Sequence, residues 1–278
     1  MTSSHRPSVA DKRRAFHALH QSGCFVIPNP WDAGSAVYLQ SLGFKALAST
    51  SSGFAWSRAH ADNHITRDMA LAHLHELAGA VDVPVNADFE SGFANDAAGV
   101  FESVHLAVET GVAGLSIEDS TGVADHPLFD LDVAVDRIRA ARRAIDKNGG
   151  DTLLVGRAEC FLVGRPDMAE TITRLQAYAN AGADCLYAPG VSAPDQIRAL
   201  VDAVAPKPFN LLVGSASPLT VAEVAALGVR RISVGGAMAR AAWGGFMRSA
   251  QLLATEGKFD GFATAASGKT LNALFSNA

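Results

Sequence analysis

Short apolar runs alternate with segments of helical period along most of this chain, and that rhythm limits the available folds more than any other feature. The runs are rich in Val, Ile, Leu and Ala and show no polar alternation, which is typical of strands covered on both faces in a parallel sheet. Eight such runs occur, at residues 24–30, 45–53, 83–90, 113–120, 152–159, 184–190, 209–214 and 230–236. The seven segments between them favour helices because their apolar residues recur with helical spacing.

Eight strands in strict alternation with helices predict a single (β/α)8 barrel over residues 1–278, with a doubly wound open sheet as the alternative. Most of the predicted helices end near glycine, the residue that favours the left-handed C-cap. A leading helix is expected over residues 11–22. Residues 238–278 are expected to form a helical arm, with a long helix, a break at 257–261 and a short helix. We expect this arm to make subunit contacts; capping of the barrel is the alternative.

Composition narrows the class of partner. A chain of 278 residues with 49% hydrophobic residues can bury a large core. A net charge of −5 without a long basic run argues against nucleic acid, and no apolar stretch approaches the roughly 20 residues that cross a bilayer. Cys24, Cys160 and Cys185 lack metal-site or disulfide spacing. We therefore expect a cytoplasmic protein that binds a small polar molecule.

Charged side chains stand where neighbouring apolar runs end. Barrel enzymes carry their chemistry at these carboxyl ends, and acids gathered there repel one another unless a cation lies among them. Mg²⁺ prefers carboxylate and water oxygens, so the pattern predicts a Mg²⁺ site; a helix cap or a salt bridge is the alternative for any single acid. The charged residues at these ends are Asp88, Glu90, Glu118, Asp119, Arg157 and Glu159.

Two further features of the predicted mouth point to a carboxylate ligand. The fork of Arg157 can hold a carboxylate in two hydrogen bonds, or it can serve as a counter-ion to the acids. Ser52, Gly53 and Phe54 follow the second run, and the N–H groups of such a turn can stabilise an oxyanion. An ordinary glycine turn is the alternative for this segment.

Taken in order, these pieces resemble the isocitrate lyase/phosphoenolpyruvate mutase superfamily across residues 25–242. The resemblance rests on STSSG at 49–53, Asp62, NADFESGF at 86–93, SIED at 116–119, GR at 156–157, GAD at 182–184 and FN at 209–210. It implies a homo-oligomeric barrel, a dimer or homotetramer with exchanged C-terminal helices. It also implies chemistry that depends on Mg²⁺, or alternatively Mn²⁺, on C–C or P–C bonds of small 2-oxo or 2-hydroxy carboxylates, through an enolate-like intermediate.

The resemblance also implies roles for individual residues. Asp88 matches the principal metal acid, and Asp62 and Glu118 match acids that reach the metal largely through bound water. The substrate-binding set it implies is Ser52, Gly53, Phe54, Asp88, Arg157 and Asn210. Within these sets, the residues predicted to take part in catalysis are Arg157, Ser52 and Glu118.

Other segments depart from the family. The stretch STGVADHPLFDLD at 120–132 lacks the Cys and Lys that the lyases carry there, which argues against classical isocitrate or methylisocitrate lyase activity. Asn86 stands where many members have Asp, and YAPG at 187–190 lacks the glutamate common in the lyases. His126 is the one titratable candidate for an acid or base in that stretch, and a solvated loop histidine is the simpler interpretation.

The predicted function is a Mg²⁺-dependent C–C lyase or decarboxylase for a small 2-oxo or 2-hydroxy acid, of the oxaloacetate type. The alternatives are a phosphonomutase-like or phosphonopyruvate-type P–C bond enzyme and a non-catalytic protein that binds Mg²⁺ and a 2-oxo acid. A Schiff-base aldolase is excluded because no lysine stands at a strand end. A sugar-phosphate barrel would leave the acid cluster without a role.

Overall fold

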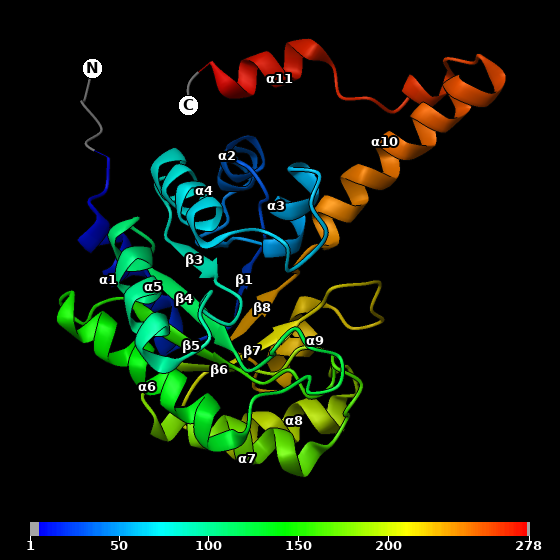
Figure 1. The fold of residues 1–278 in the computed structure, drawn as a ribbon. Helices are drawn as coiled ribbons and strands as arrows, with labels where there is room; N and C mark the ends of the chain where they lie inside the picture. Colours follow the sequence, from blue (N-terminus) through cyan, green and yellow to red (C-terminus); the bar gives the residue numbers. More distant parts are fainter. Residues whose placement is uncertain (1–5, 277–278) are drawn as a thin grey trace.

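Eight parallel strands form a nearly closed barrel surrounded by helices, as the alternation predicts (Figure 1). The computed structural model describes residues 6–276. Its strands are β1 (Phe25–Ile27), β2 (Leu47–Ala48), β3 (Val85–Asp88), β4 (Gly114–Glu118), β5 (Leu153–Arg157), β6 (Cys185–Tyr187), β7 (Phe209–Leu212) and β8 (Arg231–Ser233). Their hydrogen-bonded order, β1-β8-β7-β6-β5-β4-β3-β2, places every strand beside its neighbour in sequence except for β1 and β2.

The helices follow the strands in the predicted order. They are α1 (Val9–Gln21), α2 (Ala33–Ser41), α3 (Ser51–Ser57), α4 (Arg67–Ala80), α5 (Ala97–Glu109), α6 (Leu131–Lys147), α7 (Met168–Asn180), α8 (Pro194–Val204), α9 (Val221–Ala226), α10 (Ala237–Glu256), the 3-10 turn η1 (Asp260–Phe262) and α11 (Gly268–Phe275). Polar caps start many of them, as in the Ser8–Asp11 capping box of α1. None of the described helices is long and apolar enough to cross a membrane.

The gap between β1 and β2 is closed by a few isolated hydrogen bonds instead of a strand ladder. Between β1 and β2 the described residues form no ladder; instead, the amide of Ala48 donates to the carbonyl of Pro28 at 3.0 Å. Asn29 spans the same gap. Its Nδ2 donates to the carbonyl of Ser49, while its Oδ1 accepts from the amides of Val234 and Gly235, each at 2.9 Å. A buried amide side chain therefore joins the ends of β1, β2 and β8.

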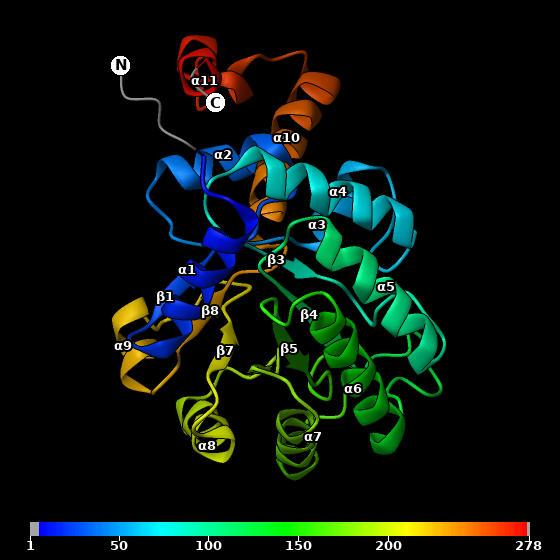
Figure 2. The ribbon, with the colours of Figure 1, turned by 90° about the vertical axis from the view of Figure 1, so that its left-hand side faces the viewer.

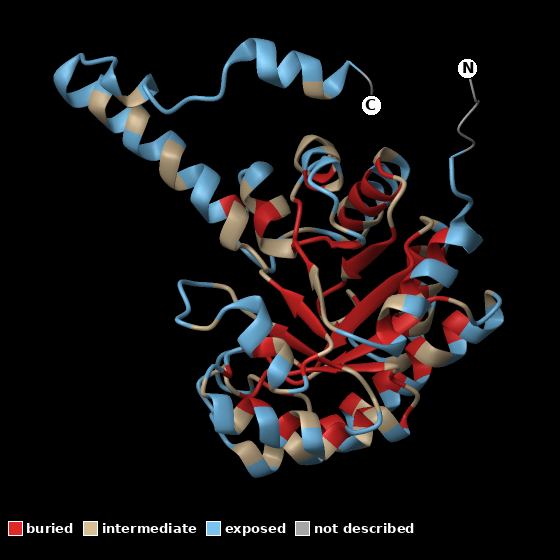
Figure 3. Cartoon of the chain, turned by 180° about the vertical axis from the view of Figure 1, so that it is seen from behind, coloured by how far each residue is buried: buried red, intermediate tan, exposed pale blue. Residues whose placement is uncertain are grey.

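The core has an inner and an outer layer, and the strands are buried on both faces (Figure 3). Phe16 of α1 reaches the inner layer, which α1 closes at the amino ends of the strands (Figure 2). That approach requires a glycine at position 114, since a Cβ there would lie 2.7 Å from the Phe16 ring. Because α1 closes the barrel at the amino ends of the strands, the open mouth is at their carboxyl ends, where the charged residues gather.

The C-terminal arm stands away from the barrel along most of its length (Figures 1 and 3). α10 extends outward from the end of β8, and α11 runs back so that Phe275 lies against Gly34 of α2. Several large apolar side chains of the arm are exposed. They are Trp243, Phe246, Met247, Leu253, Phe259, Phe262, Leu271 and Phe275. The predicted long helix, break and short helix are confirmed.

Candidate active site

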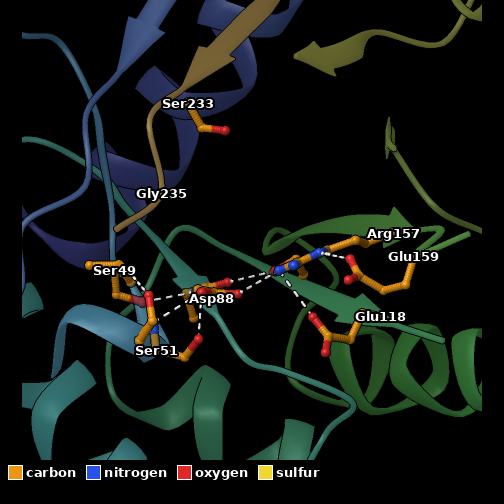
Figure 4. Close-up of polar contacts among 12 residues, drawn as sticks. Ser49, Ser51, Asp88, Glu118, Arg157, Glu159, Ser233 and Gly235 are labelled. Atoms are coloured by element: carbon orange, nitrogen blue, oxygen red, sulfur yellow. Dashed lines mark hydrogen bonds and ion pairs between the residues drawn. The ribbon is translucent and has the colours of Figure 1, made fainter. Parts of the chain in front are cut away.

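Asp88 ends β3 at the open mouth, and its carboxylate joins two sides of the site (Figure 4). One oxygen accepts from the backbone N–H of Ser51 at 3.0 Å and from its hydroxyl at 2.9 Å. The other accepts from Nη1 of Arg157 at 3.1 Å. The Ser51 amide is free to donate because Ser51 is the first residue of α3, before the helical bonding pattern begins.

Arg157 ends β5 and lies among three carboxylates (Figure 4). Its Nη1 contacts Asp88 at 3.1 Å and Glu118 at 3.0 Å, and its Nε pairs with Glu159. The guanidinium also lies 5.1 Å from the centre of the Tyr187 ring. Burial lowers the pKa of Arg157, but Glu118, Glu159 and the other acids outweigh it and hold the pKa well above its ordinary value.

Carboxylates exceed cations around this arginine. Burial is the main cause that raises the pKa values of Glu118 and Glu159, and Arg157 only partly offsets it. Asp62, in the exposed loop after α3, also has a raised pKa, because its carboxyl is desolvated and Asp88 lies nearby. The mouth of the barrel therefore holds more acidic groups than one guanidinium can pair with.

Glu90 is the least compensated of these acids. It lies in the left-handed region at φ 48°, which is strained for a residue other than glycine, and its side chain is buried. Its Oε1 has no hydrogen-bond partner among the described residues. Burial first, and then Asp88 and Asp62, raise its pKa to about 8. A buried, unpartnered carboxyl beside other acids fits a site that gains a positive charge.

The donor set fits Mg²⁺ held largely through water. Within residues 6–276 no group of three His, Cys, Asp or Glu side chains could hold a metal ion directly. Mg²⁺ does not require such a cage, because it commonly binds through one or two carboxylates and keeps several waters. The excess of acid and the unpartnered Glu90 oxygen agree with that mode. Asp88 stays predicted as the direct ligand. Asp62 and Glu118 stay predicted as water-mediated ligands.

The segment predicted to bind an oxyanion is helical. The sequence predicts a turn at Ser52, Gly53 and Phe54, but α3 starts at Ser51, capped by the Thr50 hydroxyl. The Gly53 amide donates to the Thr50 hydroxyl at 3.3 Å, and the Phe54 amide donates to the Thr50 carbonyl at 3.0 Å. Ser52 lines the cavity at the mouth. The predicted oxyanion role of all three stays a prediction.

That cavity measures about 180 Å³ and extends from the acid-rich mouth down into the barrel. Asp62, Asp88 and Arg157 line its upper part. Its wall on the β8 side holds Ser233 and Gly235 (Figure 4). This volume lies below the roughly 300–1,000 Å³ typical of pockets for drug-sized ligands, so the cavity suits a small molecule.

Asn210 and Arg231 form the floor of the site. Asn210 is fully buried; its Oδ1 accepts from Nε of Arg231 at 2.7 Å, and its Nδ2 donates to the Ser233 hydroxyl at 3.0 Å. Arg231 also donates to Oδ1 of Asn86 at 3.3 Å and lines the cavity. Arg231 is a site residue that the sequence does not predict, since an arginine that begins an apolar strand gives no sign of pointing inward.

Behind the mouth, Asp119 anchors the loop that follows β5. Its carboxylate accepts from the Glu159 amide at 2.8 Å, from the Tyr178 hydroxyl at 2.5 Å and from Arg174 at 3.1 Å. All three side chains of this network, those of Asp119, Arg174 and Tyr178, are buried. Asp119 therefore positions Glu159, and through it Arg157, instead of facing the cavity.

The loop after β4 contributes little to the site. His126 is exposed and does not line the cavity, and a turn within the loop ties the Thr121 hydroxyl to the His126 carbonyl. His60 and His64 are exposed in the loop after α3. The solvated-loop interpretation of these histidines agrees with their placement.

Comparisons with known proteins agree with this fold. The family model described as phosphoenolpyruvate phosphomutase matches residues 16–254. An uncharacterized protein of Mycobacterium tuberculosis (strain H37Rv) is 33% identical over 80% of this chain and 81% of its own. An oxaloacetate decarboxylase of Paraburkholderia xenovorans is 28% identical over 81% and 75% of the two chains. A solved structure of a putative lyase/mutase from Burkholderia cenocepacia is 46% identical, with a TM-score of 0.93 and coverage of 96% and 97%.

Proposed function

Because the chain belongs to the phosphoenolpyruvate phosphomutase family, within the isocitrate lyase/phosphoenolpyruvate mutase superfamily, we propose that it is a Mg²⁺-dependent C–C lyase or decarboxylase. Its substrate is a small 2-oxo or 2-hydroxy carboxylate of the oxaloacetate type. One observation carries the proposal: Asp88 and Arg157 pair at 3.1 Å in the lining of a small cavity whose mouth holds more carboxylate than cation. The oxaloacetate decarboxylase among the similar proteins supports the reaction type.

Different residues of this chain bind the metal and the substrate. Asp88 holds the metal, with Asp62 and Glu118 acting through water. When bound, Mg²⁺ supplies stabilisation of negative charge on the 2-oxo oxygen. Arg157 binds the adjacent carboxylate, since its protein ion pairs use Nε and Nη1 and leave Nη2 for the ligand. Ser52 binds from the α3 side of the cavity.

Decarboxylation suits the residues that are present. The bond between C3 and the departing carboxylate breaks, its electron pair forms the enolate of a 2-oxo acid, and CO₂ leaves. A proton from water then completes the product. This sequence needs charge stabilisation and no acid to activate the departing group, so the missing Cys and Lys of the 120–132 segment do not prevent it.

Proton NMR of the purified protein with Mg²⁺ tests the proposal. The panel contains oxaloacetate, malate, isocitrate, methylisocitrate, 2-oxoglutarate and phosphonopyruvate. We expect metal-dependent turnover of a 2-oxo diacid that Asp88→Ala abolishes and that Asp136→Ala retains, because Asp136 is exposed on α6 and does not line the cavity. Turnover of phosphonopyruvate alone would favour the P–C bond alternative, and binding without turnover would favour a non-catalytic Mg²⁺ and 2-oxo acid binding protein.

We further propose that the chain forms a homo-oligomer, a dimer or tetramer with exchanged C-terminal helices. Phe246 and Met247 of α10 are each 62% exposed, and contiguous apolar surface of this kind marks contact sites. Sedimentation equilibrium should give a multiple of 28.9 kDa. The double variant Phe246→Glu/Met247→Glu should shift toward monomer, whereas Val221→Glu, at an exposed apolar position on α9, should not. A monomeric wild type at high concentration would contradict this.

The free cysteines support a reducing compartment, and we propose the cytoplasm. Cys24, Cys160 and Cys185 are all unpaired among the described residues, and Cys160 and Cys185 are buried. Cell fractionation tests this placement.

A further inference from the structure

Arg231 is a buried cation without an acid. It begins β8, so it lies deeper in the barrel than Asp88 and Arg157, which end their strands. Its side chain is 2% exposed, and it has no ion pair within residues 6–276. Its hydrogen-bond partners are neutral amide oxygens of Asn210 and Asn86. Burial lowers its pKa, and no carboxylate appears among the causes that raise it.

Such an arrangement is costly unless a counter-ion arrives. Removing a charge from water is unfavourable, and paired charges or charge-assisted hydrogen bonds normally offset that cost. Two other buried arginines have acid partners: Arg13 pairs with Asp151 at 2.8 Å, and Arg174 pairs with Asp119 at 3.1 Å. Buried Arg137 has no ion pair among the described residues, but it donates to the carbonyls of Ser91 and Ala94 and does not line this cavity. Arg231 is compensated by dipoles alone, although it lines a cavity that a ligand can enter.

The two asparagines are held in the orientation that serves the guanidinium. Asn210 donates through Nδ2 to Ser233, and Asn86 donates through Nδ2 to the Ala87 carbonyl at 3.0 Å. These bonds direct both Oδ1 atoms toward Arg231. An aspartate at position 86 would give Arg231 a permanent partner, and this chain has the isosteric neutral amide there. The floor is thus built to hold a positive charge in place and to leave it unneutralised.

We propose that Arg231 is a second anion-binding subsite, which takes the distal carboxylate of the substrate and makes the site selective for dicarboxylates. The inference rests on the proposed function, since the first carboxylate and the metal occupy the mouth. Arg157 and Arg231 line the upper and lower parts of the same cavity, and its 180 Å³ suits a short diacid. Tyr187 also lines this cavity, and its ring centre lies 5.1 Å from the Arg157 guanidinium.

Calorimetric titration with lactate and malate tests the subsite, because the two 2-hydroxy acids differ by one carboxylate. With Mg²⁺ present and both enantiomers of each acid, wild type should bind malate roughly 10- to 100-fold more tightly, as expected for a charge-assisted contact. Arg231→Met should reduce the malate-to-lactate ratio to about one while retaining lactate binding, and Arg231→Lys should recover part of the ratio. Arg13→Met, which removes a buried arginine on α1, should keep the full ratio.

A second variant tests the subsite independently, in case Arg231→Met does not fold. Asn86→Asp keeps the shape of the side chain and places a carboxylate 3.3 Å from Nη1 of Arg231. It should remove the preference for malate although the arginine remains. A ratio near one in wild type, or a ratio that survives both Arg231→Met and Asn86→Asp, would overturn the proposal.

The same titrations separate this inference from the proposed function. Malate preference that depends on Arg231 but not on Mg²⁺ or Asp88 would support the subsite and refute the metal-dependent site. Binding that depends on Mg²⁺ and Asp88 without a preference for malate would do the reverse. Failure of the wild type to bind either acid would refute both.

Discussion

Two arginines, Arg157 and Arg231, line one cavity, and their surroundings are opposite in charge. At the mouth, Arg157 is surrounded by three carboxylates, with further acids nearby. At the floor, Arg231 faces two neutral amides and no acid. The mouth lacks positive charge and the floor lacks negative charge. A ligand that carries a divalent cation at one end and a carboxylate at the other corrects both, so the contrast describes the ligand better than either region does alone.

Removing Arg157 should have the largest effect, because it breaks the compensation at the mouth. Arg157→Met leaves Asp88, Glu118 and Glu159 near one another without a cation, and loss of one partner from a buried ionic cluster costs about 3–5 kcal/mol. Urea denaturation of the metal-free protein at pH 8 measures this loss. Arg165→Met is the control; its ion pair with Glu170 is half exposed and should contribute below about 1 kcal/mol. Equal losses in the two variants would contradict the expected role of Arg157.

Adding Mg²⁺ should stabilise the folded protein through the mouth and not through the floor. If the mouth binds Mg²⁺, a concentration near one hundred times the dissociation constant stabilises the folded protein by about 2.7 kcal/mol. Thermal unfolding with increasing Mg²⁺ or Mn²⁺ measures this gain. Asp88→Asn should abolish it, whereas Arg231→Met should leave it intact because the floor lies apart from the metal. An unchanged melting temperature in wild type would count against a metal at the mouth.

The positive floor should also make the fold sensitive to acid through His20. Burial first, and the charge of Arg231 second, lower the pKa of His20 to about 3 from its ordinary 6.5. Between these values the unfolded chain binds a proton that the folded chain excludes, so stability falls as pH falls below 6.5. His20 should contribute about 2 kcal/mol of lost stability between pH 7 and pH 5.

Denaturation of wild type and His20→Leu at both pH values isolates this contribution. The leucine variant should lose less stability over that range, and no hydrogen-bond partner of Nε2 is lost, since that atom has none among the described residues. Arg231→Met should also weaken the pH dependence by removing the second cause. Parallel pH profiles for wild type and His20→Leu would exclude His20 as the source.

The smallest expected effect comes from the hydrogen bond between Ser233 and Asn210, which orients the Asn210 side chain toward Arg231. Ser233→Ala leaves the buried Nδ2 of Asn210 without its acceptor, which should cost about 1 kcal/mol and reduce the malate-to-lactate ratio about fivefold. Ser51→Ala removes a comparable hydroxyl contact from Asp88 at the mouth and should leave the ratio unchanged. A similar change of the ratio in both serine variants would mean that mouth and floor do not act separately.

Much of the fold follows from the sequence because the alternation of apolar runs and helical segments is long and regular. The eight strands, the leading helix and the helical arm all occur near their predicted positions. The start of α3 was missed because Ser51, Ser52 and Gly53 are typical turn residues, whereas the Thr50 cap and packing against Trp31 and Ala239 favour the helix.

The site could be predicted only where chemistry stands out from its neighbours. Asp88 and Arg157 are conspicuous at the ends of apolar strands, and the structure brings them together at 3.1 Å. Arg231 precedes an apolar run in the same way that many solvated arginines do, and its inward direction depends on the register of β8 against β7. Asn210 was predicted to bind the substrate, but it is fully buried, contacts Arg231 and does not line the cavity. Such placement is set by long-range strand pairing, which periodicity does not encode.

The gap between β1 and β2, which only isolated hydrogen bonds close, is where the barrel should open most easily. The hydrogen bonds of Asn29 and of the Ala48 amide close this gap, so the free energy of local opening should be lowest there. The Ala48 amide should therefore exchange with deuterated solvent sooner than amides inside the β4–β5 ladder. Asn29 and Ser49 also line the cavity. A ligand held between mouth and floor lies against this gap and resists its opening, so the exchange rate of one amide reports occupancy of the cavity without any reaction being followed.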